Sequence, residues 1–345
     1  MIVVTGATGH LGNVLVRRLL QMNEKVRVLV APSEDVKPIE GLNVEIFRAD
    51  VRDSKAVERL CEGAQTVFHL AAVISIFGKK RLVYDVNVNG TKNIVEACLK
   101  NSTRLVYVSS VHAFAELSKG SLIDESVPID PSRVTGCYAK SKAIATNLVL
   151  DAAKRGLDAV VVCPTGIIGP YDWRVSEMGN LFLLHLKGRL KVAVEGGFDF
   201  VDVRDVVEAL VLAWKKAKSG EIFIVGGTHV TVKALIQMLQ KIEPKRSVKI
   251  FLPIWLAYVV SAFTSLGHLF GRKVIFTPYA VYTLSRNYVY SHTKASKELG
   301  YTPRPIEDSL KDTIEWLKSS SSTQSKTIPP WKETTFLFLL QTLSR

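Results

Sequence analysis

Short apolar runs alternate with helical patterns along the first half of the chain. The apolar runs have the length of buried strands, and they cover residues 2–4, 26–30, 43–47, 65–70, 104–108 and 159–163. Apolar residues at helical spacing predict helices after the first run, over about 85–99 and over about 138–154. Strands that alternate with helices in this way predict an α/β fold with a doubly wound parallel sheet.

A glycine turn joins the first predicted strand to the first predicted helix. Gly6, Gly9 and Gly12 follow the first apolar run directly. The first glycine permits a tight turn, the second lets backbone approach a pyrophosphate, and the third allows close helix–sheet packing. The N–H groups and the dipole of the helix start favour an anion. An ordinary glycine turn is the alternative, but this strand–turn–helix context predicts a dinucleotide site. The other loop residues expected at the cofactor are Thr8, His10 and Leu11.

The regular alternation ends near Pro164, where glycine and proline become frequent. A helix is predicted over about 175–187, and the apolar run 222–225 could return to the main sheet. We therefore divide the chain into interleaved parts, followed by a flexible tail that opens with a serine run. The predicted parts are a nucleotide-binding part of residues 1–165 and about 200–227, a substrate-binding part of residues 166–199 and 228–318, and a tail of residues 319–345 with an apolar end.

Composition and charge narrow the classes of protein. The 345 residues are 47% hydrophobic and 22% charged, which excludes a disordered chain. The net charge of +13 suits nucleic acid, an anionic membrane or a phosphorylated cofactor, but no nucleic-acid motif is present and we expect no such partner. Scattered cysteines predict reduced thiols and no metal site. The first strand begins at Ile2, so we expect a cytoplasmic protein.

Residues 251–270 are almost continuously apolar and have basic flanks. This stretch predicts a buried or pocket-covering helix, an interfacial membrane helix or a membrane span, although Pro253 and the small polar residues argue against a span. The apolar end of the tail, at 336–340, docks on the protein or touches lipid. Peripheral membrane contact through residues 251–270 or the C-terminal tail is therefore an open alternative.

Three side chains have the chemistry of carbonyl reduction. Tyr138 and Lys142 are four residues apart and share one face of a predicted helix, and Ser110 ends the fifth predicted strand. A phenol can deliver a proton to an oxygen that gains negative charge. We expect a nearby ammonium, together with the positive charge of an oxidised nicotinamide, to lower the phenol pKa. The serine hydroxyl would bond the same oxygen. These residues are the predicted catalytic trio.

The chain also contains a second tyrosine–lysine pair and a histidine close to Ser110. Tyr290 and Lys294 repeat the same spacing, but no strand-end serine precedes them and no strand of the nucleotide fold follows them. We therefore do not expect this second pair to be catalytic. His112 follows Ser110 by two residues and either reaches the substrate or is an ordinary surface or core histidine.

Together these motifs resemble the extended short-chain dehydrogenase/reductase family, the superfamily of NAD-dependent epimerases and dehydratases, over residues 1 to about 318. The resemblance implies a Rossmann fold, and it implies that Tyr138 and Lys142 also contact the cofactor. The motifs that carry it are the three glycines, Asp50-Val51, His69-Leu70-Ala71-Ala72, Asn87-Val88-Asn89-Gly90-Thr91, Ser109-Ser110, Tyr138 with Lys142, and Pro164 to Pro170. The further cofactor-binding positions that it implies are Asp50 and Val51 beside the adenine, Leu70, Ala71 and Ala72 in the cofactor groove, and Pro164 and Ile167 near the nicotinamide.

Two functions of the family compete for this chain. Residues 109–114 and 163–170 look more like the dihydroflavonol reductase and 3β-hydroxysteroid dehydrogenase branch than like nucleotide-sugar enzymes. The resemblance thus implies an oxidoreductase that interconverts a ketone and a secondary alcohol on an apolar small molecule. A nucleotide-sugar epimerase or dehydratase with tightly bound NAD is the alternative, and a cofactor-binding protein without turnover is a weaker one. We expect a homodimer or a monomer.

The identity of the cofactor depends on the end of the second strand. An acid there would bond the ribose of NAD and repel the 2′-phosphate of NADP. The strand ends at Ala31 without an acid, although Glu34 and Asp35 lie in the following loop. We therefore expect NADP, with NAD as the alternative. Nearby side chains that could contact the phosphate are Arg27, Ser33 and Lys37.

Overall fold

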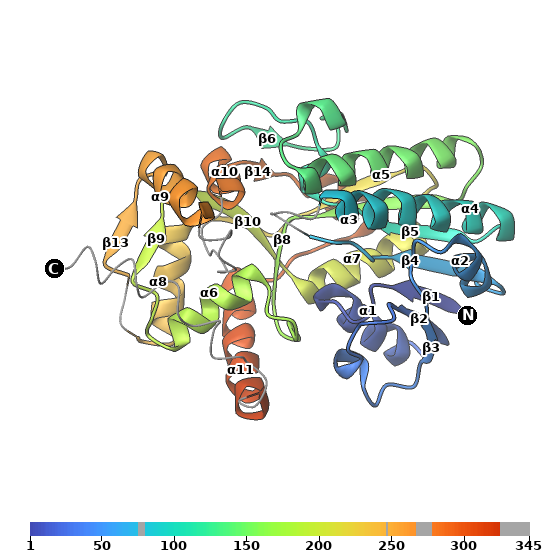
Figure 1. The fold of residues 1–345 in the computed structure, drawn as a ribbon, viewed down its shortest axis with the longest axis horizontal. Coiled ribbons are helices and arrows are strands. Elements are labelled where there is room, and N and C mark those ends of the chain that lie inside the picture. The colour runs from blue at the N-terminus through green and yellow to red at the C-terminus, as the bar shows by residue number, and fades with distance from the viewer. Residues whose placement is uncertain (75–79, 246–247, 267–277, 325–345) are drawn as a thin grey trace.

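A seven-stranded parallel sheet organises the larger part of the fold (Figure 1). The computed structural model describes residues 1–74, 80–245, 248–266 and 278–324. The strand order is β11-β7-β5-β4-β1-β2-β3. The doubly wound sheet is therefore confirmed, and residues 222–225 do return to it by pairing with β7. Its strands are β1 (Ile2–Thr5), β2 (Val26–Val30), β3 (Glu45–Arg48), β4 (Thr66–His69), β5 (Arg104–Val108), β7 (Ala159–Pro164) and β11 (Ile222–Val225).

Helices cover both faces of this sheet, so its central strands are apolar and buried on both sides. One face packs against α1 (His10–Gln21) and α7 (Val203–Lys216). The other packs against α2 (Ser54–Cys61), α4 (Thr91–Asn101) and α5 (Cys137–Lys154). The helix predicted over about 85–99 starts earlier, as α3 (Lys80–Tyr84), and widens into a π-turn over Asp85–Gly90 before α4.

The second half of the chain forms a smaller region beside the carboxyl ends of the sheet (Figure 1). Its strands form a three-stranded sheet and two short pairs, and one strand from the first half, β6, pairs with β14. These strands are β6 (Leu122–Ile123), β8 (Gly166–Ile168), β9 (Val192–Val194), β10 (Gly197–Asp202), β12 (Thr228–Thr231), β13 (Ile250–Leu252) and β14 (Val289–Tyr290). Its helices are α6 (Glu177–Leu186), α8 (Val232–Ile242), α9 (Ile254–Leu266), α10 (Pro278–Arg286) and α11 (Ile306–Gln324). Single turns of other helices cover Lys37–Ile39, Val111–Ala113, Pro131–Arg133 and Ala295–Leu299.

The apolar stretch 251–270 does not form one continuous helix. Its first two residues belong to β13, α9 begins after Pro253, and residues 267–270 lie outside the described part. Within the described ranges, the structure contains no helix with the length and apolar character that a membrane span needs. Ala257 is buried, whereas the side chain of Trp255 is 68% exposed. Contact with a membrane surface stays a prediction.

The predicted tail begins later than the serine run. Helix α11 continues through the serine run to Gln324, and the hydroxyls of the first two serines bond to the preceding turn. Ser319 Oγ donates to the carbonyl of Trp316 at 2.9 Å, and Ser320 Oγ donates to that of Leu317 at 3.4 Å. The expectation that the flexible segment opens at residue 319 is therefore wrong. Residues 325–345, with the apolar end, lie outside the described residues.

A buried histidine ties the first strand, its neighbour and a helix together. Thr5 Oγ1 accepts from the backbone N–H groups of Leu70 and Ala71, so its own proton points to His69 Nδ1, 2.7 Å away. His69 Nε2 therefore carries the ring proton and donates it to Thr91 Oγ1 at 3.0 Å. This network holds a neutral ring, and burial together with the nearby Lys142 ammonium lowers the pKa of His69 to about 3.

We expect His69 to make stability depend on pH below neutrality. An unfolded histidine takes up a proton near pH 6.5, whereas the folded one does not until about pH 3, so stability falls as pH decreases between these values. From pH 7 to pH 5 this one group should remove about 2 kcal/mol of unfolding free energy. Urea unfolding at both pH values measures this fall. The His69→Gln variant should be less stable than the natural protein at pH 7, but its unfolding free energy should fall by about 2 kcal/mol less between pH 7 and pH 5. An equal loss in the variant and in the natural protein would contradict this assignment.

Candidate functional site

The predicted dinucleotide site lies where the strand order of the main sheet reverses, between β1 and β4. Open sheets of this kind bind ligands outside the carboxyl ends of their strands at such a point. Helix α1 starts here after Gly9, and within the described residues no side chain caps its N-terminus. The backbone donors of its first turn are thus available to an anion.

Close backbone contacts shape the glycine turn. Gly6 has a φ of +70°, and a Cβ at this position would lie 2.8 Å from the backbone nitrogen of Ala71. A Cβ at Gly12 would lie only 2.1 Å from the carbonyl oxygen of Gly6. The turn, the start of α1 and the segment after β4 therefore meet at distances that side chains would prevent. This cradle fits a pyrophosphate, which needs close backbone approach.

Most of the remaining predicted cofactor positions lie along the same edge. Leu70 and Ala71 follow β4 with their N–H groups on Thr5, and Ala72 comes next. Pro164 ends β7, and Ile167 lies in β8 opposite Val201. These backbone segments flank the groove in which the cofactor is expected.

Two predicted adenine contacts follow β3, the edge strand. Asp50 accepts from the guanidinium of Arg52 at 2.6 and 2.9 Å, and these hydrogen bonds hold the pKa of Asp50 below its ordinary value. The Val51 side chain is buried, and its carbonyl accepts from Asn93 Nδ2 at 3.0 Å. Both residues are thus held in place by α4 or by their own loop.

The glycine-turn side chains also contact a segment of the second region. His10 Nε2 lies 2.9 Å from the carbonyl of Pro170, and Leu11 is buried in the core. Thr8 donates from Oγ1 to Glu34 at 2.8 Å and accepts from Arg174 at 2.5 Å. Sequence reasoning did not foresee the Arg174 contact, because 166 residues separate it from Thr8.

The three residues of the predicted catalytic trio come together beside the groove. Ser110 follows β5, and Tyr138 lies in the first turn of α5, where the Ser110 hydroxyl is near enough to lower the pKa of the phenol. Lys142 lies one turn further on, where its Nζ donates to the carbonyl of Val108 at 2.8 Å.

A buried asparagine positions the start of α5. Asn87, in the π-turn, bonds both backbone groups of Val73 and donates to Ser141 Oγ at 3.0 Å. Ser141 in turn donates to the carbonyl of Tyr138 at 2.7 Å. The segment after β4 and the helix that carries Tyr138 are therefore fixed to each other.

Burial dominates the electrostatics of Tyr138 and Lys142. Burial raises the pKa of Tyr138 to about 12, although the hydrogen bond with Ser110 lowers it in part. Burial likewise lowers the pKa of Lys142 to about 8. The lowering of the tyrosine pKa by Lys142 together with an oxidised nicotinamide stays a prediction. Both groups are far from water in this structure, which favours the neutral phenol. Tyr138 is therefore a protonated phenol at neutral pH.

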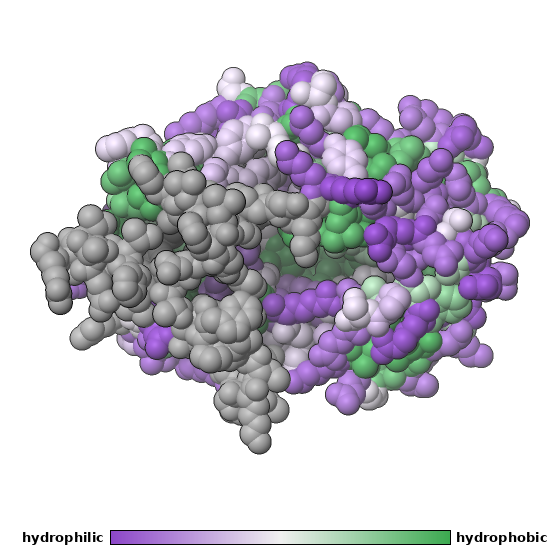
Figure 2. Space-filling model, in the orientation of Figure 1, coloured by the Kyte–Doolittle hydropathy of each residue, from purple (hydrophilic) through white to green (hydrophobic). Residues whose placement is uncertain are grey.

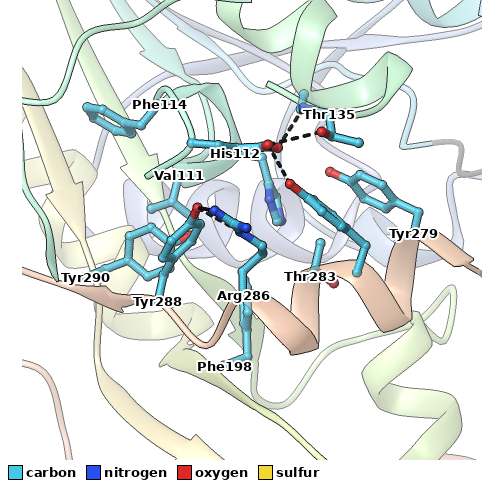
Figure 3. Close-up of a pocket in the computed structure, with 13 residues that line it drawn as sticks. Val111, His112, Phe114, Thr135, Phe198, Tyr279, Thr283, Arg286, Tyr288 and Tyr290 are labelled. Atoms are coloured by element: carbon cyan, nitrogen blue, oxygen red, sulfur yellow. Dashed lines mark hydrogen bonds between the residues drawn. The ribbon is translucent and has the colours of Figure 1, made fainter. Parts of the chain in front are cut away.

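Figure 3 shows a pocket with aromatic walls. It adjoins Tyr138 through the ring of His112. Its walls combine rings from β10, α10 and β14 with the short helix after Ser110, and the ring of His112 meets that of Tyr138 at 6.3 Å. Figure 2 shows an apolar hollow near the middle of one face, between hydrophilic surfaces. The pocket is lined by Val111, His112, Phe114, Glu116, Thr135, Ala139, Phe198, Tyr279, Tyr282, Thr283, Arg286, Tyr288 and Tyr290.

The charged side chains of this pocket already form hydrogen bonds within the protein. Glu116 accepts from the backbone and hydroxyl of Thr135 and, at 2.5 Å, from the hydroxyl of Tyr282. Arg286 Nε donates to the Tyr288 hydroxyl at 2.8 Å (Figure 3). Its Nη2 donates to the carbonyl of Leu117. Burial lowers the pKa of His112 to about 4, against the opposing effect of Glu116, so this ring is neutral at neutral pH.

His112 lies in the wall of the pocket, and that it reaches the substrate stays a prediction. Tyr290 also lines the pocket, whereas Lys294 donates to the carbonyl of Ile222 at 3.0 Å. That this second pair is not catalytic likewise stays a prediction. The pocket tyrosines carry no motif in the sequence, because short and irregular elements bring them together. Among the described residues there is no cluster of three metal-binding side chains.

Comparisons with known proteins agree with this geometry. The sequence model of the NAD dependent epimerase/dehydratase family matches residues 2–226. Sterol demethylase protein B of Methylococcus capsulatus is 31% identical over 91% of this chain and 97% of its own. The 3beta-hydroxysteroid-dehydrogenase/decarboxylase isoform 1 of Arabidopsis thaliana is 30% identical over 98% of this chain and 85% of its own. The crystal structure of gox2253 has a TM-score of 0.82 and 31% identity, covering 93% of this chain and 98% of its own.

The close contact at the glycine turn predicts a cost for any side chain at residue 12. Gly12→Ala should lower the unfolding free energy by about 3 kcal/mol, because overpacking against fixed backbone forces a shift of α1. Urea denaturation measures this cost. Gly63→Ala is the control, since a Cβ at Gly63 would meet nothing within 4 Å, and it should lose only about 1 kcal/mol, from the positive φ of that residue. Similar losses in the two variants would show that α1 adjusts without strain.

Proposed function

The chain belongs to the NAD dependent epimerase/dehydratase family, and we propose that it is an NAD(P)-dependent oxidoreductase that interconverts a ketone and a secondary alcohol on an apolar small molecule. The observation that carries the proposal is the aromatic pocket next to Tyr138. Aromatic walls favour a ring system or another flat apolar body, since such contacts bury a large area.

The charges of the pocket argue against an anionic substrate. A nucleotide sugar carries a diphosphate, which needs free cations or backbone donors. Within the described lining, Arg286 already donates to Tyr288 and Leu117, and His112 is neutral. Binding a diphosphate there would require breaking these bonds. The pocket therefore favours an uncharged molecule with few polar groups.

The side chains beside the pocket suit carbonyl chemistry. When bound, the nicotinamide supplies or accepts the hydride at the substrate carbon. Tyr138 would donate its phenolic proton to the ketone oxygen as that oxygen gains charge, while Ser110 donates a hydrogen bond to the same atom. In the reverse direction, Tyr138 would take the proton of the alcohol. Lys142 would hold the nicotinamide ribose, and its charge would stabilise the phenolate that remains.

The names of two relatives point the same way. Sterol demethylase protein B and the 3beta-hydroxysteroid-dehydrogenase/decarboxylase are named for apolar polycyclic substrates. Each is at least 30% identical to this chain over nine-tenths of its length. We therefore place steroid-like and flavonoid-like ketones first among the compounds to test.

Tyr138→Phe is the variant that tests this mechanism. The loss of the phenolic proton should reduce turnover by about 10²- to 10⁴-fold, which is the usual contribution of a general acid. The natural protein is first screened against apolar ketones with NADH and NADPH, with turnover followed by nicotinamide absorbance. Binding of the reduced cofactor, followed by nicotinamide fluorescence, should be almost unchanged in the variant.

Two results would contradict the proposal. Turnover retained in Tyr138→Phe would remove this residue from the mechanism. NAD that resists removal from the purified protein, together with binding of uridine or thymidine diphosphate sugars, would favour an epimerase or dehydratase.

A further inference from the structure

Glu34 lies at the glycine turn although it is not at the end of β2. The strand ends at Val30, and the backbone N–H of Glu34 then donates to the carbonyl of Ala31 at 2.9 Å. This tight turn directs the carboxylate back to the start of α1. There, Glu34 Oε2 accepts from Thr8 Oγ1 at 2.8 Å.

A third residue completes the cluster. Arg174 Nη2 lies 3.0 Å from Glu34 Oε1 and donates to Thr8 Oγ1 at 2.5 Å. Thr8 is buried, whereas the side chains of Glu34 and Arg174 are 29% and 50% exposed. Thr8 thus donates its single proton to the carboxylate and accepts from the guanidinium. The two charged side chains of the cluster are therefore partly open to solvent.

Arg174 belongs to a segment that is anchored on α1. Asn13 Nδ2 donates to the carbonyl of Tyr171 at 3.2 Å, and the guanidinium of Arg17 lies 5.2 Å from the centre of the Tyr171 ring. The Asp172 carboxylate accepts from the backbone of Ser176 at 2.8 Å. The position of the arginine is therefore set by the phosphate-binding helix itself.

We infer that Glu34 makes this chain select NAD(H) over NADP(H), an inference that rests on the proposed nicotinamide-dependent function. In this fold the adenosine ribose lies beside the end of β2 and the pyrophosphate lies on the glycine turn. A carboxylate at that junction can accept from ribose hydroxyls. A 2′-phosphate would instead place a second anion beside Glu34.

Arg174 does not reverse this preference. The Arg174 guanidinium is already paired with the Glu34 carboxylate. To bind a 2′-phosphate it would have to give up that partner or contact both anions at once, which leaves two anions close together with one cation. A ribose hydroxyl requires no such exchange. The expectation of NADP rested on the missing acid at Ala31, and the turn at 31–34 supplies that acid from the loop.

Titration of the cofactor-free full-length protein with NADH and NADPH, followed by nicotinamide fluorescence, tests this inference without a substrate. The natural protein should bind NADH at least about tenfold more tightly than NADPH, as expected when one close charge contact separates the two ligands. Glu34→Gln keeps the shape of the side chain and removes its charge. It should tighten NADPH binding by about tenfold and change NADH binding by less than about threefold.

Asp35→Asn is the matched control. Asp35 is the next residue and has the same charge, but it is exposed and its carboxylate accepts from the backbone of Lys37 at 2.9 Å. This variant should keep the NADH preference of the natural protein. Thermal unfolding of both variants shows that they remain folded.

The outcomes separate the inference from the proposed function. Binding of both cofactors with equal affinity, or with NADPH preferred, would overturn the inference and leave the oxidoreductase proposal standing. An unchanged affinity ratio in Glu34→Gln, or the same change in Asp35→Asn, would also overturn it. Failure of the folded protein to bind either nucleotide would overturn both.

Discussion

The first turn of α1 packs directly against the loop that precedes it, and the nucleotide-binding part predicted from the sequence is built around this contact. A Cβ at Gly12 would stand 2.1 Å from the carbonyl of Gly6, so the helix packs here only because the side chain is absent. This contact aims the uncapped helix start at the groove. The segment after β4 bonds to Thr5 and the loop that carries Arg174 bonds to Thr8, so both reach the same turn.

The reacting groups lie between two regions with different physical character. The parallel sheet supplies fixed strand ends, on which Ser110 and the start of α5 are held by hydrogen bonds to backbone and to Asn87. The second region supplies rings on short elements, and His112 contacts both sides. In such an arrangement the sheet can hold the same reacting side chains in many proteins, while the residues of the second region determine which substrate fits.

Burial affects the chemistry as much as the neighbouring charges do. Tyr138 and Lys142 are both shielded from water, and each is shifted toward its neutral form. A bound oxidised nicotinamide would add positive charge and lower the tyrosine pKa. The same shielding keeps His112 neutral, so the pocket presents aromatic surface with little free charge.

The sequence alone determined the doubly wound sheet and the glycine turn, and it singled out the three residues of the predicted catalytic trio, because these depend on local periodicity, strand ends and motif spacing. Only the tertiary structure showed which tyrosines line the pocket, that α11 extends through its serine run and that burial raises the pKa of Tyr138. It also placed Glu34 and Arg174 on Thr8, across 26 and 166 residues of chain. Long-range contacts and burial arise from the packing of distant segments, and no local pattern encodes them.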